Sequence, residues 1–183
     1  NFMILSDSEL VEMLREPRTR REGFAVLVKQ YSEKLYWKVR RIVLSHEDAN
    51  DVLQNVFIKV WSNLQNFQGK SSLSTWLYRI AVNESLDFLR KQKQADKVSA
   101  DEDVSVASRL MSDEYFDGDE VQARLQEAVA RLPEVQRTVF NLKYFEEMKY
   151  SEMSQILNTS EGALKASYHL AVKKITEYLH LFD

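Results

Sequence analysis

Residues 48–61 have the sequence DANDVLQNVFIKVW, and their apolar residues recur at the spacing of an α-helix. One apolar stripe consists of Val52, Val56, Val60 and Leu64. A second row beside it consists of Leu53, Phe57 and Trp61. Asp48 and Asp51 lie in the first turns, where carboxylates interact favourably with the helix dipole. The stretch therefore predicts an amphipathic helix that begins near Glu47 and Asp48.

Helical patterns continue on the N-terminal side of this stretch. Ser6 and Glu9 form a capping-box pattern that opens a helix, and Pro17 should end it. Residues 24–43 predict a longer helix with one buried face. That face consists of Phe24, Leu27, Val28, Tyr31, Leu35, Val39 and Ile42.

A break at Gly69, within the loop of residues 66–72, precedes a fourth predicted helix over residues 74–92. Its inward residues should be Trp76, Leu77, Ile80, Ala81, Phe88 and Leu89. Its outward residues should be Thr75, Arg79, Asn83, Asp87 and Arg90. Helices that share one core make residues 1–93 a first domain.

Residues 94–120 have little periodicity and predict a flexible acidic linker, with one short helix near residues 106–111. The charge distribution supports this division. Residues 18–97 hold 15 Lys and Arg against 8 Asp and Glu, whereas residues 98–120 hold 1 against 8. A basic module is therefore followed by an acidic strip, although the net charge of the whole chain is −3.

Residues 121–183 predict a second, smaller helical domain that ends in a helix-turn-helix. A helix over residues 121–131 precedes Pro133, which opens the next helix. The buried residues of that helix should be Val135, Val139, Leu142 and Phe145. A short helix over 151–157 and a tight turn at 158–160 lead to a long helix from Glu161 to about Leu179. Its apolar face should consist of Leu164, Tyr168, Ala171, Val172 and Ile175.

Composition excludes several classes of function. The chain has no cysteine, so disulfides, thiolate metal sites and a cysteine nucleophile are excluded. No apolar run approaches the roughly 18 residues of a membrane span. His46, Glu47, Asp48 and Asp51 form the only cluster that suggests a metal site, and helix N-capping explains it more simply. We therefore expect no catalytic residue, no metal and no cofactor.

Two surfaces suit nucleic acid. A helix-turn-helix places its second helix in the major groove, and Gly162 and Ala163 would allow close approach there. The loop and fourth helix of the first module suit single-stranded DNA, which needs aromatic faces and cations. The aromatic residues are Phe67, Trp76 and Tyr78, and the cations are Lys70, Arg79, Arg90, Lys91 and Lys93. A core position remains the simpler interpretation of Trp76.

The motifs together resemble bacterial sigma factors of the extracytoplasmic-function (ECF) group. Residues 48–61 resemble the helix that binds core RNA polymerase, residues 67–69 and 74–83 with Asp87 and Arg90 resemble the promoter-melting region, and residues 132–133, 150–153 and 160–165 resemble the C-terminal DNA-reading module. The resemblance implies a factor that binds core RNA polymerase and directs promoter recognition, DNA melting and transcription initiation.

The resemblance also implies residue roles. Polymerase binding falls to Asp48, Asp51, Gln54, Asn55 and Lys59. Contact with the minus-ten element falls to Phe67, Gln68, Lys70, Ser71, Ser72, Trp76, Arg79, Asn83, Asp87 and Arg90. Contact with the minus-thirty-five element falls to Ser160, Glu161, Gly162, Ala163, Lys165, Ala166, Ser167, His169 and Lys173.

Further partners are implied as well. An anti-sigma factor is expected to hold the chain inactive, and the linker would thread towards the RNA exit path. The chain should be a cytoplasmic monomer when free of partners, which an anti-sigma factor could recruit to the inner membrane.

The chain departs from the family pattern at several positions. Ser167, Leu170 and Val172 stand where arginines are usual, Ser154 and Thr159 replace apolar residues, and Leu73 replaces an aromatic. These departures predict weak minus-thirty-five binding, or protein contacts at Leu170 and Val172. Two alternatives stay open: a free-standing dimeric DNA-binding regulator, and a protein-binding member whose DNA-reading helix has decayed.

Overall fold

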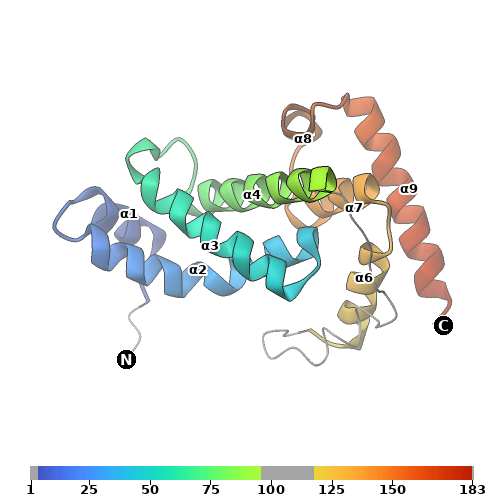
Figure 1. Cartoon of the computed structure of the whole chain (residues 1–183), viewed down its shortest axis with the longest axis horizontal. Helices are drawn as coiled ribbons and strands as arrows, with labels where there is room; N and C mark the ends of the chain where they lie inside the picture. Colours follow the sequence, from blue (N-terminus) through green and yellow to red (C-terminus); the bar gives the residue numbers. More distant parts are fainter. Residues whose placement is uncertain (1–3, 96–117, 183) are drawn as a thin grey trace. The chain divides into compact units, whose positions relative to one another are not determined.

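The computed structural model describes residues 4–95 and 118–182. All regular elements within these residues are helical, and the chain divides into two compact units, Asn1–Lys97 and Val98–Asp183 (Figure 1). The predicted all-α class is confirmed. Most of the predicted linker, with the short helix expected at residues 106–111, lies outside the described residues.

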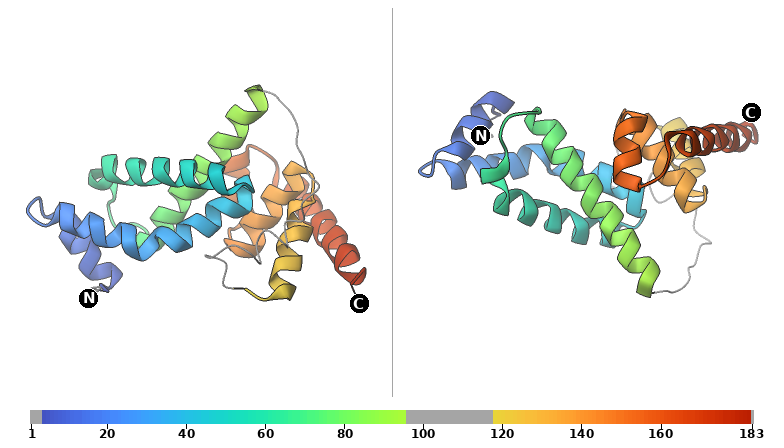
Figure 2. Two further views of the ribbon diagram at one scale, coloured as in Figure 1. Left: turned by 60° about the horizontal axis from the view of Figure 1, so that its bottom comes forward. Right: turned by 90° about the horizontal axis from the view of Figure 1, so that it is seen from above.

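The first unit is built on three long helices that contact one another. Its elements are α1 (Asp7–Arg15), α2 (Arg20–Val43), α3 (His46–Ser62), the 3₁₀ turn η1 (Leu64–Asn66) and α4 (Leu73–Ala95). α2, α3 and α4 each pack against the other two, and α1 packs against α2 (Figure 2).

Small and branched side chains fill the space between these helices. The buried residues include Leu27, Leu35 and Val39 of α2, Val52, Val56 and Val60 of α3, and Leu77 and Ala81 of α4. Full burial of one such side chain contributes about 1.5–3 kcal/mol. The valine stripe of α3 is thus confirmed as core.

The turn between α1 and α2 shows why α2 begins at Arg20 and not at Phe24. The Thr19 hydroxyl donates to the Met13 carbonyl at 2.8 Å, and the Arg20 guanidinium donates to the Leu14 carbonyl at 2.9 Å. These polar contacts hold the first turn of α2, which apolar periodicity does not detect. Helix α1 ends at Arg15, as Pro17 predicted. Glu16 has the extended backbone that a following proline favours.

Helix α4 matches the predicted pattern and runs three residues further, to Ala95. Among the residues predicted to point inward, Leu77, Ala81 and Leu89 are buried, whereas Trp76, Ile80 and Phe88 are half-buried.

The second unit is organised around its last helix. Its elements are α6 (Glu120–Ala130), α7 (Glu134–Phe140), the π-helical turn η2 (Asn141–Phe145), α8 (Tyr150–Leu157) and α9 (Glu161–His180). α6, α7 and α8 all contact α9. The buried cluster consists of Ala128, Val129, Leu132, Phe140, Ala171 and Ile175. Phe140 stacks on Tyr168 of α9, with 5.8 Å between ring centroids.

Two residues predicted to be buried in this unit are exposed. Val135 is 62% exposed, because the buried face of α7 begins one turn later than the periodicity suggested. Val172 is 39% exposed, because it lies about 100° around the helix from buried Ala171. The π-helical turn after Phe140 was not predicted.

The predicted turn between α8 and α9 is confirmed. Asn158 adopts the left-handed conformation, with φ of 53° and ψ of 46°. Ser160 then caps α9 by accepting the Ala163 amide at 3.2 Å. This geometry fixes where the first turn of α9 begins.

Gly23 permits the close approach of α1 to α2, which gives a stability prediction. A Cβ at this position would lie 2.9 Å from the Cβ of Met13. Gly23→Ala should therefore lower the free energy of unfolding by about 1–3 kcal/mol, despite the better helix propensity of alanine. Chemical unfolding followed by circular dichroism measures this difference.

Gly162→Ala is the matched control, because nothing lies within 4 Å of the added Cβ. We expect it to raise the free energy of unfolding by up to about 1 kcal/mol. Equal stabilisation by both substitutions would contradict the tight contact at Gly23.

Candidate functional site

Burial of the valine stripe places a polar row on the opposite side of α3. Asp51, Gln54 and Asn55 are exposed, and Asp48 is half-buried. Their spacing of three and four residues places them along one side of the helix. The backbone amide of Asp48 donates to the Ser45 hydroxyl at 3.1 Å, so Ser45 caps α3.

An apolar surface continues this row and was missed in the sequence. Ile58 is 66% exposed and Trp61 is 43% exposed. With Arg21, Phe24 and Phe57 they line a hollow of about 400 Å³. The Phe24 and Trp61 rings lie 5.0 Å apart in an edge-to-face arrangement. The signal available in the sequence was that Ile58 follows Gln54 by four residues and Asn55 by three, which places an apolar side chain on the polar side of the helix.

His46 does not form a metal site with its acidic neighbours. Its Nδ1 lies 2.6 Å from the Tyr36 hydroxyl, and its Nε2 lies 3.1 Å from the Asn50 side-chain amide. Both ring nitrogens are therefore engaged in hydrogen bonds. Over residues 4–95 and 118–182, no group of three histidines and acids is arranged to hold a metal ion. No helix within those residues is long and apolar enough to span a membrane.

The outward face of α4 carries the second predicted group of residues. Arg79, Asn83 and Arg90 are exposed, and Asp87 is half-buried. Positions 79, 83, 87 and 90 follow helical spacing, so the four side chains form one row. Arg90 Nη1 and Asp87 Oδ1 form an ion pair at 2.9 Å within that row.

The loop before α4 contributes aromatic and polar groups. Phe67 and Trp76 are half-buried and pack together, with ring centroids 5.0 Å apart. Gln68 and Lys70 are exposed, and Ser71 is half-buried. The Trp76 side chain is therefore partly buried and partly exposed to solvent.

Two other residues near this loop have structural roles. The Ser72 hydroxyl accepts the Thr75 amide at 3.2 Å, which caps α4. Tyr78 packs towards α2, where the Lys38 ammonium lies 4.2 Å from its ring centroid. The structure therefore separates Tyr78 from the row formed by Arg79 and Asn83.

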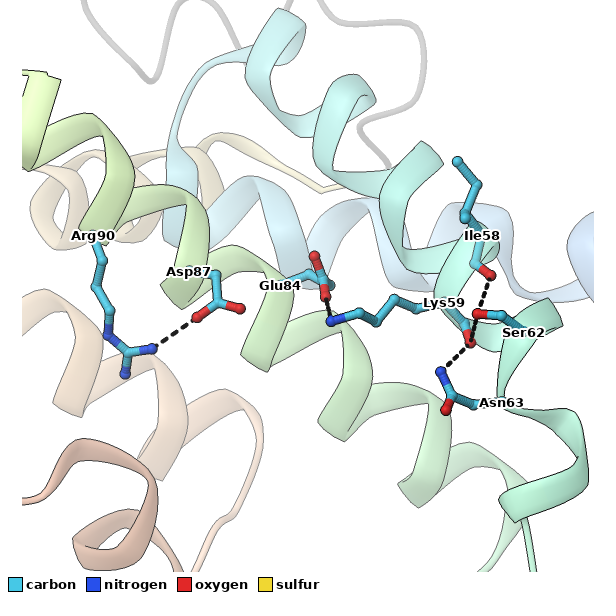
Figure 3. A network of polar contacts seen from close by, with 7 residues as sticks. All are labelled: Ile58, Lys59, Ser62, Asn63, Glu84, Asp87 and Arg90. Carbon is cyan, nitrogen blue, oxygen red and sulfur yellow. Dashed lines mark hydrogen bonds and ion pairs between the residues drawn. The ribbon is translucent and has the colours of Figure 1, made fainter.

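A salt bridge joins the polar rows of α3 and α4. Figure 3 shows Lys59 of α3 reaching Glu84 of α4, with 2.7 Å between Nζ and Oε1. The hydrogen bond and charge of Glu84 raise the pKa of Lys59 above its usual value. Glu84 lies three residues before Asp87, whose charge also raises the pKa of Lys59, so the bridge reaches the edge of the α4 row. Lys59 was predicted to contact polymerase, and its ammonium is already engaged within the unit.

The third predicted group lies on α9, facing away from the core of the second unit. Eight of its nine residues are exposed: Ser160, Glu161, Gly162, Ala163, Lys165, Ala166, His169 and Lys173. Ser167 is half-buried. Leu170, which was not among the nine, is 46% exposed.

The polar residues at unusual positions have local explanations. The Ser154 hydroxyl donates to the Thr159 carbonyl at 2.6 Å, and the Thr159 hydroxyl donates to the Leu157 carbonyl at 3.0 Å. Both side chains therefore stabilise the turn between α8 and α9. Leu73 is buried, so its side chain belongs to the core of the first unit.

Comparison with known proteins identifies both units. Residues 27–95 match the model of sigma-70 region 2, and residues 122–175 match that of sigma-70 region 4. The chain is 32% identical over 157 residues to the ECF RNA polymerase sigma factor SigW of Bacillus subtilis, with 81% of this chain and 84% of the relative covered. It is 30% identical over 182 residues to the RNA polymerase sigma-H factor of Pseudomonas aeruginosa, with 94% and 93% covered.

Solved structures agree on the fold. The sigma factor RpoE of Bartonella quintana, solved with the anti-sigma factor NepR, superposes with a TM-score of 0.62 at 19% identity, covering 87% of this chain and 98% of that chain. CnrH, solved with the cytosolic domain of CnrY, gives a TM-score of 0.57 at 19% identity, covering 97% and 96%. Two region matches and full-length relatives lead to one conclusion: the chain belongs to the sigma-70 family, as an ECF sigma factor that directs promoter recognition by RNA polymerase.

Proposed function

We propose that the three outward-facing rows divide the work of this sigma factor. The α3 row docks on core RNA polymerase, the loop and α4 row engage the minus-ten element, and α9 reads the minus-thirty-five element. The observation that carries this proposal is the exposure of these rows on helices whose opposite faces are buried. The proposed domain limits are residues 1–93 and 121–183, with 94–120 as linker.

The docking surface on α3 combines polar and apolar groups in the manner of a protein interface. Asp51, Gln54 and Asn55 supply hydrogen-bonding groups, and Ile58 and Trp61 supply exposed apolar area at the hollow beside them. Protein interfaces typically surround such apolar anchors with a polar rim. This continuity supports one polymerase-binding surface that is larger than the polar row alone.

The minus-ten surface has the groups that a separated DNA strand requires. Asn83 can pair with the edge of an unstacked base, and the Phe67–Trp76 pair offers an aromatic edge close to the loop. Lys70, Arg79 and Arg90 are placed to neutralise phosphates. Asp87 acts within this surface by orienting Arg90 through their ion pair.

The Lys59–Glu84 bridge gives Lys59 a role that differs from direct docking. Buried side chains hold α3 against α4, and the bridge fixes the Lys59 side chain beside α4. Polymerase binding would then place Asn83 at a defined position relative to the DNA. We assign Lys59 to this positioning role.

We also propose an anti-sigma factor as a partner and a purely non-enzymatic action. The solved relatives RpoE and CnrH are recorded with partner proteins, which supports the first assignment. An anti-sigma factor anchored in the inner membrane would hold this chain at the cytoplasmic face. The matches to sigma-70 regions 2 and 4 support the second assignment.

The proposed role of α3 gives a prediction for polymerase binding. The double substitution Asp51→Ala and Gln54→Ala should weaken binding to core polymerase at least tenfold, and Ile58→Ala should weaken it severalfold. The side chains are exposed, so the fold should be intact by circular dichroism. Fluorescence anisotropy of labelled chain against core polymerase measures the affinity. Glu33→Ala, an exposed change on α2, serves as the control and should bind normally.

The second prediction concerns promoter opening. Asn83→Ala should leave polymerase binding unchanged and reduce open-complex formation at least tenfold, because only the base contact is lost. Permanganate footprinting of melted thymines provides the readout. The assignment of separate roles to α3 and α4 would fail if the α3 variants and Asn83→Ala lost both activities equally.

A further inference from the structure

The exposed surface of α9 carries lysine but none of the other side chains that usually read bases by paired hydrogen bonds. Arginine or lysine reads guanine, and asparagine or glutamine reads adenine, through bidentate contacts in the major groove. The sequence of α9, EGALKASYHLAVKKITEYLH, contains no arginine, asparagine or glutamine. If this helix occupies the groove, apolar contacts are a further source of sequence discrimination beside its lysines.

A row of apolar side chains lies on the exposed surface of α9, where base-reading polar side chains would be expected. Ala163, Ala166 and Leu170 are all exposed, and their spacing of three and four residues aligns them on one side of α9. The row extends over about 10 Å of helix axis, at 1.5 Å per residue. It therefore fits within the first three turns of the helix, which approach base edges in this motif.

Lysines elsewhere on the second unit complement the charge of a DNA duplex. The Lys143 and Lys165 ammonium groups lie 4.4 Å and 5.7 Å from the ring centroid of Tyr150, at the start of α8. Lys173 and Lys174 are exposed on the later turns of α9. Phosphate contacts and base contacts can thus come from different side chains.

We propose that Ala163, Ala166 and Leu170 read thymine methyl groups in the major groove of the minus-thirty-five element. The thymine C5-methyl is the one apolar group that base pairs present in that groove, and apolar side chains recognise it by contact. The small side chains of Ala163 and Ala166 allow the α9 backbone to approach the base edges closely. The longer Leu170 side chain can contact a methyl group further from the helix axis. The inference rests on the proposed role of the second unit in reading duplex DNA.

The test removes the methyl groups without altering base pairing. Holoenzyme assembled from the full chain and core polymerase first selects bound duplexes from a library randomised over both promoter elements. The selected upstream element is then resynthesised with deoxyuridine in place of each thymidine. We expect holoenzyme affinity to fall about fourfold per contacted methyl, the factor given by burial of one methylene-sized group.

Two variants locate the contact. Leu170→Ala should bind the thymine and uracil duplexes with affinities within about twofold of each other at the position that Leu170 contacts. Val172→Ala is the matched control, because Val172 is also an exposed apolar residue of α9 and lies outside the row. It should keep the full wild-type preference for thymine.

The possible outcomes separate the inference from the proposed function. Selection of an upstream element that binds equally well with uracil would overturn methyl reading and leave the role of the second unit intact. Selection of no upstream element would remove that role and the inference together. Equal weakening of both duplexes by Leu170→Ala would assign Leu170 to a protein contact and also overturn the inference.

Discussion

The structure of the first unit depends on burial of the valine stripe of α3. Val52, Val56 and Val60 are enclosed by α2 and α4, and this fixes the rotation of α3 about its own axis. Because a helix repeats every 3.6 residues, the rotation that buries the valines turns Asp51, Gln54 and Asn55 outward. The core and the proposed docking surface are therefore opposite faces of the same helix, set by one pattern of residues. A change that rotated α3 would remove both together.

The same logic links α3 to α4 and gives the first unit its functional geometry. Leu77 and Ala81 are buried on the inner face of α4, and Arg79 and Asn83 are consequently exposed on its outer face. The Lys59–Glu84 bridge then joins the two outward rows at their common edge. Exposed salt bridges contribute little to stability, typically below about 1 kcal/mol. The main consequence of the Lys59–Glu84 bridge is therefore positional, because it keeps the Lys59 side chain of α3 next to α4.

The second unit presents α9, the proposed DNA-reading helix, with an unusual division of chemistry. Ser160 and Asn158 set the start of α9, and Phe140 stacked on Tyr168 anchors its inner face. These contacts leave alanines and a leucine on the surface where hydrogen-bonding side chains would be expected. The hydrogen bonds of Ser154 and Thr159 show that the turn before α9 remains well formed despite its polar residues. A well-formed turn does not suggest a decayed helix-turn-helix, and it favours a changed mode of reading over a lost one.

The amino-acid sequence determined the helical class, the two-unit organisation, the buried stripe of α3, the left-handed turn at Asn158 and most of the outward residues. These features depend on local periodicity and backbone preference, which a single chain segment displays on its own. Tertiary structure alone decided that Val135 and Val172 are exposed, that Tyr78 turns towards α2, and that Lys59 is bridged to Glu84. It also decided that Ile58 and Trp61 border a hollow with Phe24. Each of these features depends on whether a neighbouring helix covers a given turn. The periodicity of one helix carries no information about where the helix packed against it ends.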